Sequence, residues 1–347
     1  MGLIDWMKRV FGSGDRHEAA RRADEGIERF WAFWRAHADE LSTQAGEKMS
    51  DDLVQAVQSA VADIHPELDW EFGPGAVATH SFTVSGHGDA GLRLLAERWR
   101  RLAPASDHFD FFVTRQAEAR DKLMGMRLEL ADEQLVFSEV RLGLERDENR
   151  RIVNVGIYHP AFARLDEDAR VQASFLILDD TLGEDGVERW VGALEVMQTA
   201  PEGGVDLLGL LDDVAQVKAL PEDTWCLGES EEDGLPVVHL VNLAAKRWDY
   251  PLFDTWCAVR LDYEGNDTGM PSPSDREALD SLEDGLTAFL DDAGINLGRR
   301  TGAGYREAYV YVDGSTDSAE RLLAWTKGCG WPARLRVEED PQWSRRP

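Results

Sequence analysis

The stretch INLGRRTGAGYREAYVYV, residues 295–312, decides the fold of the C-terminal part of the chain. Its two halves are separated by Gly302-Ala303-Gly304, which predicts two antiparallel strands joined by a hairpin turn. Working outward, the pattern predicts a helix on each side of this hairpin and a further strand beyond each helix. The predicted elements are strand 256–263, helix 274–290, strand 295–301, strand 305–312, helix 315–326 and strand 333–338.

This β-α-β-β-α-β order predicts a ferredoxin-like sandwich, in which both helices cover one face of the sheet. Side chains alternate between the two faces of a strand, so the pattern also predicts which residues face the helices. The predicted core residues are Cys257, Val259, Leu261, Ala308, Val310, Val312, Ala333, Leu335 and Val337. The opposite face then carries Trp256, Arg260, Tyr309, Tyr311, Arg334 and Arg336.

That opposite face would be aromatic and basic on an otherwise acidic protein, as binding surfaces often are. It could stack the bases of single-stranded RNA or receive an acidic partner. Alternatively, the N-terminal region or the central strands pack onto it, bury the rings and pair the arginines with local carboxylates. The covered arrangement is favoured, because an open face this aromatic rarely stays bare in a monomer.

The rest of the chain predicts an α+β protein of several regions. Residues 15–118 predict a long amphipathic helix, a second helix from Asp51 capped by Ser50, a strand hairpin around Gly73-Pro74-Gly75, a helix and a strand. This order parallels the C-terminal block, so a second, related sandwich is one interpretation. The predicted regions are an amphipathic segment 1–14, the helical and sandwich-like region 15–118, an antiparallel meander with a helix 119–200, an acidic linker with one short helix 201–250, and the ferredoxin-like domain 251–347.

Several motifs of the last block resemble the bacterial family called domain of unknown function 695. They are YEGNDTGMP at 263–271, LED at 282–284, TGAGYREAYVY at 301–311 and EDPQW at 339–343, with FW at 30–31 and WEFGPG at 70–75 resembling a region often found N-terminal to that domain. A looser resemblance in domain layout links such domains to the B-type protein regulators of ribonuclease E. The resemblance implies a fold and a protein-binding regulator, but it transfers no functional residue.

Composition limits the classes of partner. The 66 acidic and 37 basic side chains give a formal charge of −29, which disfavours generic binding to nucleic acids or anionic membranes. Three widely spaced cysteines, Cys226, Cys257 and Cys329, show no metal-ligand spacing and suit a reducing cytoplasm. The sequence shows neither a transmembrane run nor a signal peptide, so we expect a cytoplasmic protein.

Catalytic chemistry finds little support in the sequence. No nucleophile elbow or cysteine-protease signature is present, and no catalytic residue is assigned. His80 and His87 lie seven residues apart and are more simply surface histidines than metal ligands. A run of carboxylates could hold a hard cation or raise the pKa of one of its members, although such runs are usually solvated surface: Asp179, Asp180, Glu184 and Asp185.

The sequence therefore predicts a non-enzymatic interaction or regulatory protein that binds another protein, without cofactor or metal. One alternative is a metal-assisted hydrolase that uses Glu184, Asp185 and a nearby histidine. Another is a protein that binds single-stranded RNA or nucleotides through the open sheet face, which requires Tyr309, Tyr311 and Arg334 to be exposed. The sequence does not identify the partner or the oligomeric state.

Overall fold

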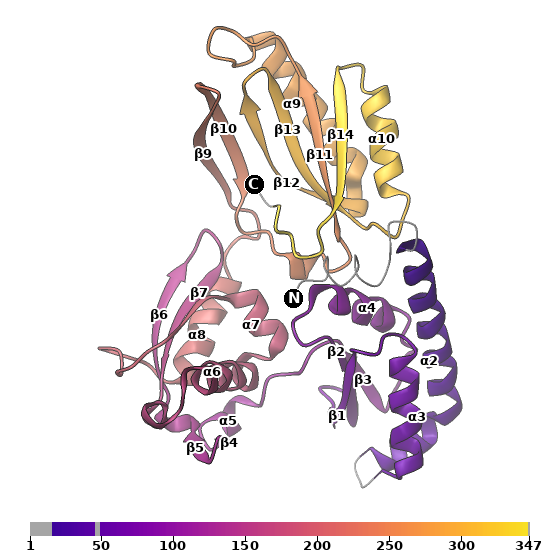
Figure 1. Cartoon of the computed structure of the whole chain (residues 1–347), viewed down its shortest axis with the longest axis vertical. Helices are drawn as coiled ribbons and strands as arrows, with labels where there is room; N and C mark the ends of the chain where they lie inside the picture. The colour runs from indigo at the N-terminus through magenta and orange to yellow at the C-terminus, as the bar shows by residue number, and fades with distance from the viewer. Residues whose placement is uncertain (1–15, 46–48, 346–347) are drawn as a thin grey trace. The chain divides into compact units, whose positions relative to one another are not determined.

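The computed structural model describes residues 16–45 and 49–345 and divides the chain into two compact units, Met1–Leu220 (unit 1) and Pro221–Pro347 (unit 2). Both units combine helices with antiparallel or mixed sheets, so the predicted α+β class is confirmed (Figure 1). The amphipathic segment predicted for residues 1–14 lies outside the described residues. Within the two described ranges, no helix has both the length and the apolar character needed to cross a lipid bilayer.

The N-terminal part of unit 1 builds an aromatic core between its helices and a three-stranded sheet. The apolar stripe predicted for the long helix supplies Phe30 and Trp34, which are both buried, and Phe82 from the sheet lies 4.7 Å from Trp34 between ring centroids. Ser50 caps the next helix, because its hydroxyl accepts a hydrogen bond from the Leu53 amide at 3.4 Å. The elements are α2 (Arg16–Gln44), α3 (Asp51–Ala62), β1 (Asp69–Pro74), β2 (His80–Ser85), α4 (Ala90–Arg101) and β3 (Phe109–Phe112).

This part of unit 1 has the element order expected for a relative of the C-terminal block, but its sheet is built differently. The strand order is β1-β2-β3, with β1 antiparallel and β3 parallel to β2. In unit 2, the strands that correspond to β2 and β3 are Tyr305–Val312 and Ala333–Glu339. The strand Thr255–Asp262 lies between them. The N-terminal sheet therefore resembles the C-terminal one in order, without its first strand.

The second part of unit 1 contains two small sheets where a single meander was expected. The hairpin β4–β5 stands apart from the sheet β6-β7-β8, because the short 3₁₀ helix Phe137–Glu139, whose Phe137 is buried, interrupts the run of strands. The strand β8 pairs parallel to β7, and a short helix, α7, precedes it. The elements are α5 (Arg120–Leu123), β4 (Arg127–Leu130), β5 (Glu133–Val136), β6 (Arg141–Asp147), β7 (Ile152–Tyr158), α6 (Glu167–Leu182), α7 (Glu184–Trp190), β8 (Val191–Val196) and α8 (Leu207–Lys218).

Unit 2 is built on one antiparallel sheet of six strands in the order β14-β11-β13-β12-β10-β9 (Figure 1). The hairpin 295–312 forms β12 and β13, as predicted. Its turn comes so close to β10 that a Cβ atom on Gly302 would lie 2.4 Å from the Pro236 carbonyl oxygen, so only glycine fits there. The elements are β9 (Trp225–Glu232), β10 (Leu235–Asn242), β11 (Thr255–Asp262), α9 (Pro273–Leu290), β12 (Gly294–Gly302), β13 (Tyr305–Val312), α10 (Ser318–Gly328) and β14 (Ala333–Glu339).

The two faces of this sheet have separate cores. Helices α9 and α10 pack on the face that carries Cys257, Val259 and Val310, so the predicted alternation holds on these strands. Val337 is an exception, with 44% of its surface exposed, because β14 lies at the edge of the sheet. The other face has a smaller aromatic cluster.

Residues 201–250, expected to be an acidic linker, are largely ordered structure. They contain α8, which was predicted, and the hairpin β9–β10, which was not. Val237 and Val241 of β10 are buried, whereas β9 has a neighbour on one side only and leaves Glu229 and Glu231 exposed. In the sequence, an edge strand rich in acidic residues therefore cannot be told from an acidic linker.

Candidate functional site

The most suggestive site in unit 1 is a pocket of about 450 Å³ between the sheet of its N-terminal part and the helices α6 and α7. The pairing of Asp69 with Ser85 and of Glu71 with Thr83 puts these four side chains on one face of the β1–β2 hairpin. This is the face opposite the aromatic core, since the alternate residues point into that core. The lining residues are Asp69, Trp70, Glu71, Thr83, Ser85, His87, Gly88, Arg115, Phe175, Leu176, Asp179, Glu184, Val187 and Glu188.

Glu184, the first residue of α7, is fixed at the pocket by two loops. Its Oε1 accepts a hydrogen bond from the Gly88 amide at 3.1 Å, and its Oε2 accepts one from the Arg115 amide at 3.3 Å. The backbone at Gly88 has a φ of +76°, a conformation that glycine adopts without strain. Both oxygens of Glu184 are therefore engaged by backbone amides, which position this carboxylate firmly.

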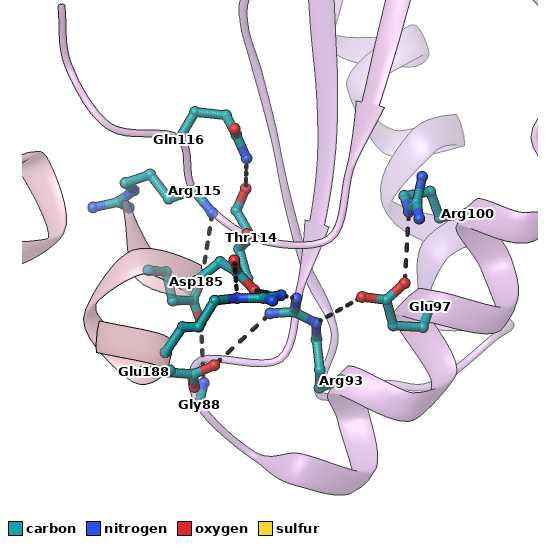
Figure 2. Close-up of polar contacts among 11 residues, drawn as sticks. Gly88, Arg93, Glu97, Arg100, Thr114, Arg115, Gln116, Asp185 and Glu188 are labelled. Atoms are coloured by element: carbon teal, nitrogen blue, oxygen red, sulfur yellow. Dashed lines mark hydrogen bonds and ion pairs between the residues drawn. The ribbon is translucent and has the colours of Figure 1, made fainter. Parts of the chain in front are cut away.

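A buried ion-pair network lies beside the pocket and joins α4 to α7 (Figure 2). The Arg93 side chain is 8% exposed and donates to Glu97 at 3.1 Å and to Asp185 at 2.9 Å. Its other guanidinium nitrogen lies 3.8 Å from Glu188. Arg100 and Arg189 add outer pairs to Glu97 and Asp185, at 3.5 and 3.1 Å. The network holds α7, and with it Glu184 and Glu188, against the N-terminal part of the unit.

Asp179, near the C-terminal end of α6, is the chemically distinctive group of the pocket. Burial and repulsion from Glu184 raise its pKa from 3.8 to about 6, although the nearby Arg115 partly opposes the shift. The neighbouring Asp180 has a raised pKa as well, mainly because of burial. In the part of the chain that the structure describes, the Asp179 carboxylate has no hydrogen bond or ion pair. It is thus available to a ligand.

The charge of the pocket is strongly one-sided. Five carboxylates line it, and its two basic side chains already have acidic partners: Arg115 lies 3.7 Å from Glu71, and His87 lies 3.1 Å from Asp69. Phe175, which is 47% exposed, adds aromatic surface. Such a site attracts a cation with an apolar stem and repels phosphate.

The six residues predicted for the sheet face of unit 2 do not form one exposed surface. The three rings are buried, with exposures of 2% for Trp256, 9% for Tyr309 and 0% for Tyr311. They are covered by residues of unit 2 itself, namely Ala245, Tyr250, Phe253 and Trp343. The predicted cover, the N-terminal region or the central strands, is not what packs in this cluster.

The three arginines of that face are at its margin, where each one has an acidic partner. Arg260 donates to Asp262 at 2.8 Å and lies over the Tyr305 ring, and Arg334 donates to the same carboxylate at 2.7 Å. Arg336 lies 3.8 Å from Glu338 and stacks over Trp256. The pairing of the arginines with local carboxylates was predicted, and it partly offsets their charge.

The carboxylates proposed as metal ligands are occupied in other ways. Glu184 accepts hydrogen bonds from two backbone amides, and Asp185 accepts hydrogen bonds from two arginine side chains. Across residues 16–45 and 49–345, no group of three or more His, Cys, Asp or Glu side chains is arranged to hold a metal ion. His87 pairs with Asp69, and His80 packs against Phe109.

Sequence reasoning singled out Asp179 and Glu184 as members of a carboxylate run, but it missed the pocket that they line. The pocket depends on contacts between segments that are far apart, such as Gly88 and Glu184. One signal was readable: the alternation of β1 places Asp69 and Glu71 on the face opposite Trp70 and Phe72. Two acids on the outer face of a short strand indicate that this face is polar, but they do not show which element borders it.

Replacing Asp179 with asparagine should stabilise unit 1 at neutral and alkaline pH. A folded pKa of about 6 against 3.8 means that the fold loses stability as the pH rises from 4 through 6, where Asp179 must ionise in place. Two pKa units correspond to ~3 kcal/mol, and partial exposure to solvent reduces the expected gain to about 1 kcal/mol at pH 8. At pH 4 the two proteins should have nearly equal free energies of unfolding.

The measurement is urea unfolding at both pH values, followed by hydrogen exchange of the α6 amides. Glu195→Gln, at an exposed position of β8, is the matched control and should change little at either pH. An equal gain for Asp179→Asn at pH 4 and pH 8 would show that the carboxylate is not destabilised by ionisation.

Comparisons with known proteins address unit 2 alone. No curated protein and no solved structure matched the chain. A model of the family of unknown function DUF695 matches residues 223–345, a range that begins just before β9 and so includes the β9–β10 hairpin. The match confirms the family suspected from the motifs at 263–271 and 301–311: residues 223–345 of this chain match the DUF695 family model.

Proposed function

We propose that this protein is a non-enzymatic binding protein, which recognises a cationic group of another protein in the acidic pocket of unit 1. The observation that carries the proposal is Asp179: an unpaired carboxylate with a raised pKa, in a pocket with four further carboxylates and the exposed ring of Phe175. A guanidinium or ammonium group would pair with Asp179 while its stem packs on Phe175. The net charge of −29 would speed the approach of a basic partner at low salt.

The arrangement of unit 2 is compatible with a binding role. The strand order β14-β11-β13-β12, with both helices on one face, is what a ferredoxin-like sandwich requires, and we propose that unit 2 is such a sandwich extended by the β9–β10 hairpin. The layout resemblance to protein regulators of ribonuclease E agrees with a binding role. The three free cysteines agree with a reducing compartment such as the cytoplasm.

The alternatives have less support in the placement of their residues. A metal-assisted hydrolase would need Glu184 and Asp185 free to bind a cation, but backbone amides and arginines occupy them. Base stacking would need Tyr309 and Tyr311 exposed, but both are buried. The protein-binding proposal requires neither free Glu184 and Asp185 carboxylates nor exposed Tyr309 and Tyr311 rings.

The test uses the smallest cation that carries the proposed chemistry, N-acetyl-arginine amide, with N-acetyl-citrulline amide as its uncharged match. Titration is followed by the NMR signals of the Gly88 and Arg115 backbone amides, which donate to Glu184 in the pocket. Arginine should bind saturably and citrulline should not. Binding should strengthen as the pH rises from 5 to 7.5, because Asp179 ionises with a pKa of about 6.

Asp179→Asn should weaken arginine binding about tenfold, the order of one charge-assisted hydrogen bond, and remove most of the pH dependence. Glu195→Gln should bind as the parent protein does. Equal binding of citrulline and arginine, or an unchanged affinity in Asp179→Asn, would refute the pocket as a cation site.

A further inference from the structure

The strand β9 is an open edge of the sheet in unit 2. It is the last strand in the order and pairs with β10 alone. In an antiparallel pair, every second residue directs its N–H and C=O groups away from its neighbour, so half of the β9 backbone faces outward. Among the described residues, no backbone group of residues 225–232 bonds outside the β9–β10 pair. The outward groups are thus ready to pair with another strand.

Two large apolar side chains lie at the start of this edge. Trp225 is 44% exposed and Leu227 is 71% exposed. The register pairs Leu227 with Leu240, and Leu240 with Arg299, which binds Glu283 of α9 at 2.6 Å. Trp225 and Leu227 therefore point to the helix-bearing face of the sheet. An added strand could bury them with its own apolar side chains.

Two acids follow on the same face. Alternation along β9 places Glu229 and Glu231 in line with Leu227, and both are exposed. Neither of them forms an ion pair within the ranges that the structure describes, whereas Glu232 on the other face is held by Arg300 at 3.2 Å and by the Tyr305 hydroxyl at 2.6 Å. Along this face of β9 the side chains are therefore two apolar residues, Trp225 and Leu227, followed by two acids, Glu229 and Glu231.

Charge decides which occupant fits this edge. A second copy of the chain would pair its β9 antiparallel to the first across a two-fold axis. In a pair centred on Glu229, the Glu229 side chains of the two copies lie opposite each other. In a pair centred on Gly228, Glu231 of each copy lies opposite Trp225 of the other. Neither register supplies a cation to either acid, and like charges directly opposite each other are destabilising. These pairings disfavour a second copy, and the two unpaired acids favour a basic strand.

We propose that β9 is a docking edge for an extended, basic segment of a partner protein, which adds to the sheet as a seventh strand. In antiparallel addition, the segment would place two basic side chains opposite Glu231 and Glu229 and two apolar ones opposite Leu227 and Trp225. Main-chain hydrogen bonds supply affinity in this mode, and the alternate side chains supply specificity. The site lies in unit 2 and does not depend on the pocket of unit 1.

The test compares two blocked peptides that differ only in charge, acetyl-KTKTVTW-amide and acetyl-ETETVTW-amide, on the full chain. The basic peptide should bind about tenfold more tightly at low salt, because two attractive cross-strand pairs replace two repulsive ones. Its binding should slow the hydrogen exchange of the β9 amides. The double variant Glu229→Lys/Glu231→Lys should reverse the preference between the two peptides.

Asp179→Asn is included to separate this site from the pocket, and it should leave both the β9 protection and the charge preference unchanged. Equal affinity for the two peptides, protection that falls outside β9, or loss of binding in Asp179→Asn would overturn the proposal. Self-association of the free chain with protection of the same β9 amides would overturn it in favour of a second copy.

Discussion

Arg93→Met should destabilise unit 1 by about 3 kcal/mol, because it leaves buried carboxylates without their shared cation. Glu97 is 5% exposed and would keep only Arg100, at 3.5 Å, while Asp185 would keep Arg189. Because these partners remain, we expect a loss of stability at the lower end of the range that is typical for breaking a buried ion pair. We expect α7 to loosen first, because Arg93 is the residue that connects it to α4.

Urea unfolding followed by hydrogen exchange of the α4 and α7 amides measures this loss, with the β13 amides of unit 2 as an internal reference. Arg100→Met is the matched control: it removes an arginine from the same acid, but its side chain is 50% exposed and should contribute less than about 1 kcal/mol. Changing both residues, in Arg93→Met/Glu97→Met, should recover part of the stability, since the most buried carboxylate of the network is then removed together with its cation. If Arg93→Met costs no more than Arg100→Met, the network does not hold the two helices together.

The elements of unit 2 were predictable where one local signal was strong. The turn at Gly302-Ala303-Gly304 and the alternation through Tyr305–Val312 gave the central hairpin, and the apolar residues of β11 and β13 fall on the predicted face. The hairpin β9–β10 escaped prediction because acids on an edge strand are as soluble as acids in a linker. Its inclusion in the range matched by the family model shows that it belongs to the domain.

What covers a face is harder to predict than which residues share it. Alternation correctly grouped Trp256, Tyr309 and Tyr311, but no local pattern shows that Trp343 and the segment around Tyr250 would pack on them. The acidic pocket depends even more on distant contacts, because its walls come from segments on either side of residue 115. Sequence periodicity predicts single helices and strands, whereas a pocket forms only where several of them pack together.

The C-terminal segment should be essential to unit 2, because Trp343 closes the aromatic face of the sheet. Its ring stacks on Tyr311 with a centroid distance of 4.6 Å, and its indole N–H donates to the Phe253 carbonyl at 2.7 Å. Burial alone would raise the pKa of Asp340, but hydrogen bonds from Tyr311, from Ser344 and from the Arg345 amide outweigh it and hold that pKa below its usual value. The ionised Asp340 thus ties the segment to Tyr311.

Trp343→Ala should therefore lower the free energy of unfolding of unit 2 by about 3 to 4 kcal/mol, as expected for a large aromatic side chain that is 3% exposed. The loss should appear as faster hydrogen exchange in β11 and β13, the strands that carry Trp256 and Tyr311, while unit 1 exchanges as before. Trp225→Ala removes the same ring from an exposed edge position and should cost less than about 1 kcal/mol. Equal costs for the two substitutions would mean that the C-terminal segment only rests on the sheet, and that the predicted aromatic face opens to ligands without much loss of stability.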